Sequence, residues 1–193
     1  MENNFRIKVF DEIPENIVGQ VDRLLESNGS NNRISEDAPR ANESRERFIN
    51  KKDRIKYILT FDKDQVVGII IIFKREIKFK GEKLIVGGIG AVGTKKEYRG
   101  KGIATKMLRI AREELEKATC DIATLGTDIT DPVMVKMYGK IGFVPLGRNH
   151  VYLGMSGKSY TSNDLMIAPI KSKEKFQEVL TDKSPFNLGQ GLW

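Results

Sequence analysis

Most apolar residues of this chain fall in short runs with the spacing of β-strands. Residues 5–10 alternate apolar and polar side chains, whereas residues 65–79 and 83–94 are rich in isoleucine and valine. Alternation indicates a half-buried strand, and a β-branched run indicates a strand at the centre of a sheet. The predicted strands cover residues 5–10, 54–61, 65–79, 83–94, 121–127, 143–146, 150–155 and 164–170, with residues 143–146 and 150–155 closing the sheet.

Other segments repeat their apolar residues every three or four positions, which predicts amphipathic helices. The predicted helices cover residues 14–27, 42–51, 102–118, 131–141 and 172–180. Residues 28–41 are polar and rich in turn-forming residues, so we predict a loop that is either a substrate lid or a plain surface insertion. Residues 184–193 are predicted to form an irregular tail.

The most informative stretch is residues 98–104, Tyr-Arg-Gly-Lys-Gly-Ile-Ala, because it joins a predicted strand to a predicted helix. The first turn of a helix has about four N–H groups without intrahelical partners, and a diphosphate can accept from several of them. Gly100 and Gly102 leave these groups accessible, and Arg99 and Lys101 add cationic donors. The stretch predicts an anionic nucleotide site or, alternatively, a tight turn with a solvated basic face.

Residues 94–104 resemble the acetyl-CoA diphosphate loop of the GNAT superfamily of N-acetyltransferases, whose pattern is Arg/Gln-x-x-Gly-x-Gly/Ala. Residues 131–143 are similar to a second GNAT signature, Asn-x-x-x-x-x-x-Tyr-x-x-x-Gly-Phe. The resemblance covers residues 57–153 and implies an α/β (α+β) fold. That fold has a mixed, mostly antiparallel central sheet of about six to seven strands, flanked by about four helices and splayed at the cofactor-binding strand.

The resemblance also implies a cosubstrate and a reaction. Acetyl-CoA would be held by the strand and the loop, and a primary amine would attack its thioester directly within a ternary complex. The implied cofactor-binding residues are Ala91, Val92, Gly93, Thr94, Arg99, Gly100, Lys101, Gly102, Ile103, Ala104 and Asp131. Tyr138 matches the family's general acid for the departing thiolate, its alternative being a tyrosine that anchors its helix. A backbone N–H of residues 91–94 is the expected oxyanion donor.

The general base departs from the family pattern. Many relatives place a glutamate on the strand before the loop, but residues 84–94 contain no carboxylate. Either water relays the proton, or a carboxylate comes from elsewhere, the candidates being Glu82, Asp128, Asp131 and the terminal carboxylate of Trp193. Asp131 also replaces the usual asparagine, and because an ionised carboxylate cannot donate, its contact with pantetheine is in question.

Glycines at positions 87, 88, 90 and 93 interrupt the strand that precedes the loop. Glycine weakens a strand and lets a ligand or another backbone come close. In the GNAT fold this strand pairs with the pantetheine arm, so the resemblance implies that role for it. A bulged structural strand is the alternative.

The sequence leaves the acceptor amine open. Residues 137–143 and Trp193 are similar to bacterial aminoglycoside acetyltransferases, some of which use a chain terminus in the active site; a tryptophan packed on the surface is the favoured alternative. An acidic pocket for such polycations would require Asp11, Glu12, Glu15, Glu36 and Asp37 to converge. Amino acids, polyamines and protein N-termini or lysines stay open, as does a non-catalytic acyl-CoA-binding domain.

The composition limits the classes of protein to which the chain can belong. A chain of 193 residues, 39% of them apolar, predicts a single domain over residues 1–193, with residues 156–193 as a C-terminal extension. The net charge of +7 comes with interleaved acids and without aromatic interleaving, so nucleic acid is not expected. No apolar run has the length of a membrane span, and no signal-peptide pattern is found, which predicts a cytoplasmic enzyme without a membrane partner.

The single cysteine and the single histidine limit disulfide and metal chemistry. Cys120 is the one cysteine, which excludes an internal disulfide, and His150 is the one histidine, which makes a His/Cys metal cage unexpected. His150 is a further candidate base, with a structural role favoured. The expected partners are therefore acetyl-CoA and a small-molecule or peptide amine, and a homodimer is one assembly that the sequence allows.

Overall fold

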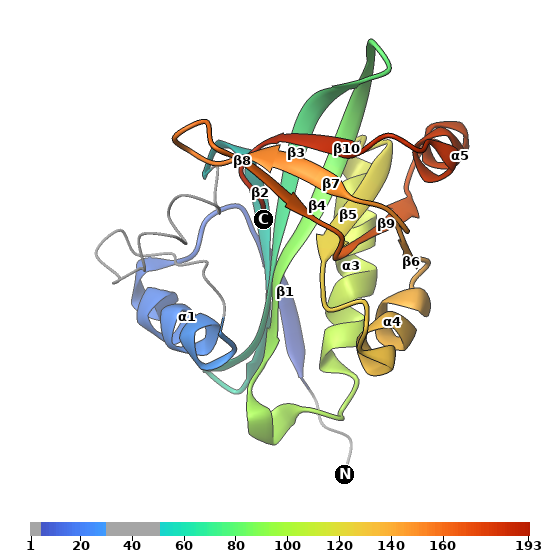
Figure 1. Cartoon of the computed structure of the whole chain (residues 1–193). Coiled ribbons are helices and arrows are strands. Elements are labelled where there is room, and N and C mark those ends of the chain that lie inside the picture. Colours follow the sequence, from blue (N-terminus) through green and yellow to red (C-terminus); the bar gives the residue numbers. More distant parts are fainter. Residues whose placement is uncertain (1–4, 30–50) are drawn as a thin grey trace.

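The apolar runs form a seven-stranded sheet in the computed structural model, which describes residues 5–29 and 51–193. The strand order is β1-β2-β3-β4-β5-β9-β6, and all neighbouring pairs are antiparallel except β4 with β5. The strands are β1 (Arg6–Phe10), β2 (Arg54–Asp62), β3 (Gln65–Phe79), β4 (Glu82–Thr94), β5 (Ile122–Gly126), β6 (Val144–Pro145) and β9 (Leu165–Pro169). The predicted mixed, mostly antiparallel sheet is confirmed (Figure 1).

Helices cover both faces of this sheet (Figure 1). Within the described ranges they are α1 (Glu15–Ser27), α3 (Ile103–Lys117), α4 (Pro132–Gly139) and α5 (Lys173–Thr181). On one face, Met107 of α3 packs with Ile70 and Ile72 of β3; on the other, α1 and α5 contribute Leu24 and Phe176 to a second cluster. No helix in this part of the chain is both long and apolar enough to cross a bilayer.

Part of the prediction concerns residues that the structure does not describe. The predicted helix at residues 42–51 and the predicted loop at residues 28–41 lie outside the described residues, except for positions 28, 29 and 51. Asn28 follows the end of α1, and residue 51 begins a 3-10 helix, η1 (Lys51–Asp53).

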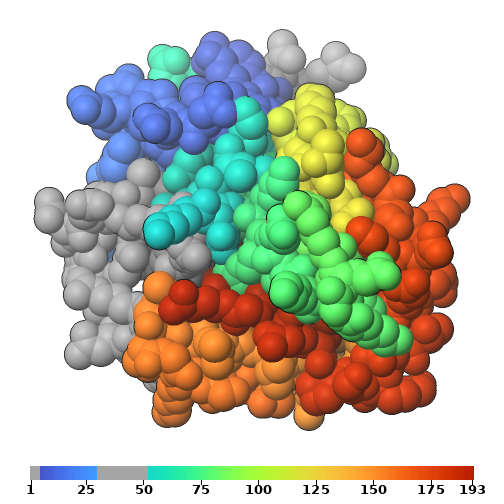
Figure 2. Space-filling view, turned by 90° about the horizontal axis from the view of Figure 1, so that it is seen from above, coloured from blue at the N-terminus to red at the C-terminus, as the bar shows by residue number. Residues whose placement is uncertain are grey.

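A second sheet of three strands, which the sequence analysis did not predict, lies against the α1 face of the main sheet. Its order is β10-β7-β8, formed by β10 (Phe186–Gln190), β7 (His150–Leu153) and β8 (Ser159–Ser162). Figure 2 shows these segments, in red and orange, beside the green β3–β4 hairpin. Two predictions were therefore wrong: residues 150–155 do not close the main sheet, and residues 184–193 are not an irregular tail. β10 pairs in parallel with β7, a partner too distant in sequence for local patterns to indicate.

Strands β4 and β5 diverge part-way along their length. They pair at three positions, the last being Gly88 with Thr124, although β4 continues to Thr94. A bulge in β4 against β3 follows this point, and within it Ala91 has a φ of 53°. The predicted splay at the cofactor-binding strand is confirmed, because residues 89–94 pair with β3 on one edge and with no described strand on the other.

Candidate functional site

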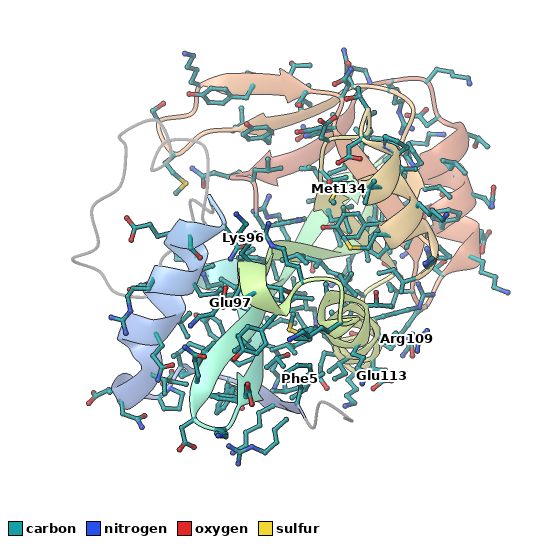
Figure 3. All side chains as sticks on the ribbon, turned by 90° about the horizontal axis from the view of Figure 1, so that it is seen from below. Phe5, Lys96, Glu97, Arg109, Glu113 and Met134 are labelled. Atoms are coloured by element: carbon teal, nitrogen blue, oxygen red, sulfur yellow. The ribbon has the colours of Figure 1, made fainter. Side chains whose placement is uncertain are left out.

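A cleft of about 870 Å³ opens between the end of β4, the start of α3 and helix α4. The predicted site residues that line it are Val92, Thr94, Arg99, Gly100, Gly102, Ile103, Ala104 and Tyr138. Figure 3 shows this region from below, with Lys96 and Glu97 on the turn between β4 and α3, and Met134 on α4. The other predicted residues, Ala91, Gly93, Lys101 and Asp131, are not among the lining residues.

The turn from β4 into α3 has the geometry of an anion site. It passes through a 3-10 helix, η2 (Lys96–Tyr98), and then through Gly100 and Gly102, whose φ values are 76° and 75°. Gly102 is the N-cap of α3, and no side chain caps the first turn. A Cβ on either glycine would meet no atom within 4 Å, so glycine is required there by the backbone conformation and not by crowding. The N–H groups and the positive end of the helix dipole are thus available to an anion.

Tyr138 lies on the α4 side of the cleft. Its side chain is 6% exposed and packs edge-on against Phe143, with ring centroids 6.4 Å apart. Its hydroxyl makes no hydrogen bond to any residue that the structure describes, and burial raises the pKa of Tyr138 to about 12. The phenol is therefore a protonated donor at neutral pH, without a protein acceptor in the described part of the chain.

Thr94 contributes a second polar group to the cleft. Its side chain is 8% exposed, and its Oγ1 is buried with no hydrogen-bond partner among the described residues. Buried hydroxyls are normally hydrogen-bonded, so an unpartnered one in a cleft indicates a place for a polar ligand group. Thr94 was predicted to act through its backbone, and its unpartnered hydroxyl is a feature that only the structure reveals.

The sequence analysis missed several lining residues. They are Asn28 at the end of α1, Tyr98 before the glycine turn, Thr105 on α3, and Pro132, Val133, Met134, Lys136, Met137 and Lys140 on or beside α4. The predicted motif includes the α4 residues but gives a role only to its asparagine and tyrosine positions. No sequence pattern indicated a role for Asn28, because it was interpreted as the first residue of a polar loop.

No carboxylate of the described residues lines the cleft. Glu82 begins β4 at the far end of the hairpin, and Asp128 accepts from Thr130, which lowers the pKa of Asp128. Asp131 is the N-cap of α4, where its Oδ1 accepts from the N–H of Val133 at 2.8 Å. The structure thus brings none of these three candidate bases to the cleft lining.

Two further candidates, His150 and Asp11, do not line the cleft either. His150 is fully buried in the second sheet, stacked on Tyr152 and 3.7 Å from Asp164, and burial lowers the pKa of His150. Asp11 forms an ion pair with Lys56, whereas Glu36 and Asp37 lie outside the described residues.

Trp193 is buried against the glycines of β4, so the favoured expectation that it packs on the surface was wrong. The side chain is 7% exposed and stacks on Phe73 with ring centroids 6.0 Å apart. A Cβ on Gly88 would lie 2.3 Å from Cε2 of Trp193, and one on Gly90 would lie 2.9 Å from its main-chain carbon. These two glycines therefore make room for residue 193 of the same chain.

Arg75 ties the segment that carries Trp193 to the sheet. Its Nη1 donates to the carbonyls of Leu188 and Gly191, and its guanidinium lies 4.6 Å from the centre of the Trp193 ring. The charge is balanced by Asp53, whose Oδ2 accepts from Nε at 2.7 Å. Arg75 thereby joins η1, β3 and the segment after β10.

Comparison with known proteins identifies relatives of this chain. The family model described as the acetyltransferase (GNAT) domain matches residues 32–146. N-alpha-acetyltransferase 30 of Saccharomyces cerevisiae is 29% identical over 87 residues, which cover 45% of this chain and 47% of that protein. The chain spans about half the length of the curated relatives it matches.

Solved structures share the fold at lower identity. The GNAT family N-acetyltransferase YhbS from Escherichia coli, in complex with CoA, aligns with a TM-score of 0.59 at 14% identity, over 98% of this chain and 92% of that one. A structure of the NatC complex bound to Gag peptide and CoA aligns with a TM-score of 0.56 at 18% identity, over 86% of this chain and 98% of that one.

Proposed function

The chain belongs to the GNAT acetyltransferase family, and from that premise we propose that it transfers the acetyl group of acetyl-CoA to a primary amine. The amine attacks the thioester directly, in a ternary complex. The main support for the proposal is the cleft itself. Its lining includes a glycine turn whose N–H groups no side chain caps, and it also includes a buried, protonated tyrosine.

The cleft can hold the two ends of a CoA thioester. The diphosphate would accept from the N–H groups at the start of α3, near Gly102, with Arg99 as a cationic donor. The edge of residues 89–94 without a described strand partner can pair with the amides of the pantetheine arm, and Thr94 of that edge lines the cleft. An N–H of residues 91–94 would then stabilise the oxyanion.

Tyr138 would act at the sulfur. A thiol has a pKa of about 8.5, so complete proton transfer from a phenol with a pKa of about 12 to a free thiolate is uphill by about 5 kcal/mol. We therefore assign the hydroxyl as a hydrogen-bond donor that stabilises negative charge on sulfur as the C–S bond breaks. Water takes the proton of the attacking amine in this scheme, because no described carboxylate lines the cleft.

A peptide or protein α-amine is the first acceptor to test. The support is the similarity to N-alpha-acetyltransferases of yeast and Arabidopsis thaliana, at 29% and 28% identity. Aminoglycosides, polyamines and free amino acids complete the panel. Release of free thiol from acetyl-CoA with each amine measures turnover, and calorimetry with CoA measures binding.

Tyr138→Phe separates catalysis from scaffolding. It keeps the buried ring and removes a hydroxyl without a described protein partner, so we expect kcat to fall about 100-fold, as for loss of one hydrogen-bond donor to charge that develops in the transition state, while the unfolding free energy changes by less than about 1 kcal/mol. Tyr57→Phe, a partly buried tyrosine on β2 outside the cleft, is the control. Unchanged turnover of Tyr138→Phe would refute the assigned role. CoA binding without turnover on every amine would favour the non-catalytic alternative.

A further inference from the structure

We propose that Asn28 is a positioning residue that orients Arg99 toward the CoA diphosphate and so couples cofactor affinity to the end of α1. The inference rests on the proposed binding of a CoA thioester in the cleft. It adds a residue that lies outside both family motifs, at the end of α1, the helix that packs on the face of the sheet opposite α3.

The amide of Asn28 bridges two elements. Its Nδ2 donates to the carbonyl of Leu24 at 2.8 Å, in the last turn of α1. Its Oδ1 accepts from Nη2 of Arg99 at 3.0 Å, on the turn between β4 and α3. With both ends of the amide engaged, the side chain has one favoured orientation, and that orientation presents an acceptor to Arg99.

Arg99 is held at a second point on the same side chain. Its Nε donates to the carbonyl of Thr94 at 3.2 Å, whereas Nη1 has no partner in the described part of the chain. A planar guanidinium fixed at Nε and Nη2 has a defined plane, so its remaining donors are pre-oriented for a phosphate oxygen. Without Asn28, one of the two fixed points is lost, and ligand binding must restrict a flexible side chain.

The position of Arg99 makes this orientation matter. Arg99 borders the cleft and also a groove of about 700 Å³ on the α1 side, which Arg23, Lys95 and Lys96 line as well. An arginine that borders two cavities can point into either of them. Its side chain therefore contributes to the cleft only when another contact fixes its orientation. Asn28, which lines the cleft, supplies that hold.

Gly93 provides an independent way to move Asn28. A Cβ on Gly93 would lie 3.2 Å from both Cγ and Nδ2 of Asn28, and Gly93 is not among the residues with positive φ. A larger residue is therefore disfavoured here by contact and not by backbone conformation, because the Asn28 amide would have to shift by a few tenths of an ångström. Gly93→Ala is expected to displace the Asn28 amide from its two hydrogen bonds.

The test is a double-mutant cycle on the Kd for CoA, measured by calorimetry. Asn28→Ala and Arg99→Ala are each expected to weaken CoA binding about ten-fold, the size of one hydrogen bond to a charged group, and the double variant to bind no more weakly than Arg99→Ala. Ser27→Ala is the control. The Ser27 hydroxyl donates to the same Leu24 carbonyl at 2.9 Å and accepts from Nδ2 of Asn28 only at 3.5 Å, the outer limit of a hydrogen bond, so its removal is expected to leave the Kd near the wild-type value. Gly93→Ala is expected to weaken binding in the wild-type background more than in Asn28→Ala.

Kinetics distinguish a positioning role for Asn28 from a purely structural role at the end of α1. In Asn28→Ala, KM for acetyl-CoA is expected to rise about ten-fold while kcat and KM for the amine stay near wild type. An unchanged Kd in Asn28→Ala, or a loss that is equally large with and without Arg99, would overturn the inference. If the wild-type protein binds CoA and Asn28→Ala binds it equally well, only the role of Asn28 fails; if the wild type binds no CoA, the proposed function fails with it.

Discussion

Replacing Gly88 by alanine tests the packing of Trp193 on β4. The substitution adds one methyl group to a strand position without positive φ, so the backbone itself tolerates it. The added Cβ would lie 2.3 Å from Cε2 and 2.5 Å from Cδ2 and Nε1 of Trp193, closer than side-chain atoms approach one another. Because Trp193 is also stacked on Phe73, the indole cannot move away without loss of that contact.

The expected cost follows from these contacts. Overpacking a core by one methyl group typically costs about 1–3 kcal/mol. Complete expulsion of the indole sets the ceiling, about 4–6 kcal/mol for the 150–250 Å² that a buried tryptophan removes from water at about 25 cal/mol per Å². Alanine also gains about 0.5–1 kcal/mol over glycine in a strand. We therefore expect Gly88→Ala to lower the unfolding free energy by about 2 kcal/mol, or Tm by about 4–8 °C.

Urea denaturation followed by tryptophan fluorescence measures the unfolding free energy. It also reports the environment of the Trp193 indole, because Trp193 is the single tryptophan of the chain. Gly88→Ala is expected to shift the native emission to longer wavelength as the indole becomes exposed. Gly126→Ala, on β5 with no atom within 4 Å of its added Cβ, is the control and is expected to be neutral or slightly stabilising. In a Trp193→Ala background, followed by circular dichroism, Gly88→Ala should cost nothing. An equal cost in both backgrounds, or unchanged emission with full stability, would refute the packing described here.

Three further predictions concern other parts of the molecule. Arg75→Met is expected to lower the unfolding free energy by about 3–5 kcal/mol, because Asp53 loses its buried partner, and Asp53→Asn made in that variant should recover part of the loss in urea denaturation. Gly102→Ala is expected to cost about 1–2 kcal/mol from its φ of 75° and to weaken CoA binding in calorimetry, whereas Gly139→Ala, in α4 with nothing near its added Cβ, should not destabilise. Burial raises the pKa of the Cys120 thiol to about 11 from an ordinary value of 9.0. The thiol therefore loses its proton at lower pH in the unfolded chain than in the folded one, so the unfolding free energy is expected to fall as pH rises from about 9 to about 11. Thermal melts across that range should show a smaller loss in Cys120→Ala, and an identical loss would contradict the assignment.

Local sequence patterns were sufficient to predict the elements that depend on residues close to one another in the sequence. The alternation in β1, the β-branched runs of β3 and β4 and the helical spacing of α3 all predicted their elements within a few residues. The glycine turn at residues 100–102 was also readable, since a positive φ is a property of the residue itself. Tyr138 was found through a motif, and its burial became known only from the structure.

Tertiary structure decided the features that join distant segments. A strand was predicted at residues 164–170, but only the structure places this strand, β9, between β5 and β6 of the main sheet and adds β10 to the second sheet. Gly88 and Gly90 were read as room for a ligand, whereas they accommodate Trp193, and Asn28 was read as loop although it contacts Arg99. Periodicity and motifs report each residue's preference for a helix, strand or turn. The identity of the partner across a long stretch of chain depends on packing, which only the folded arrangement reveals.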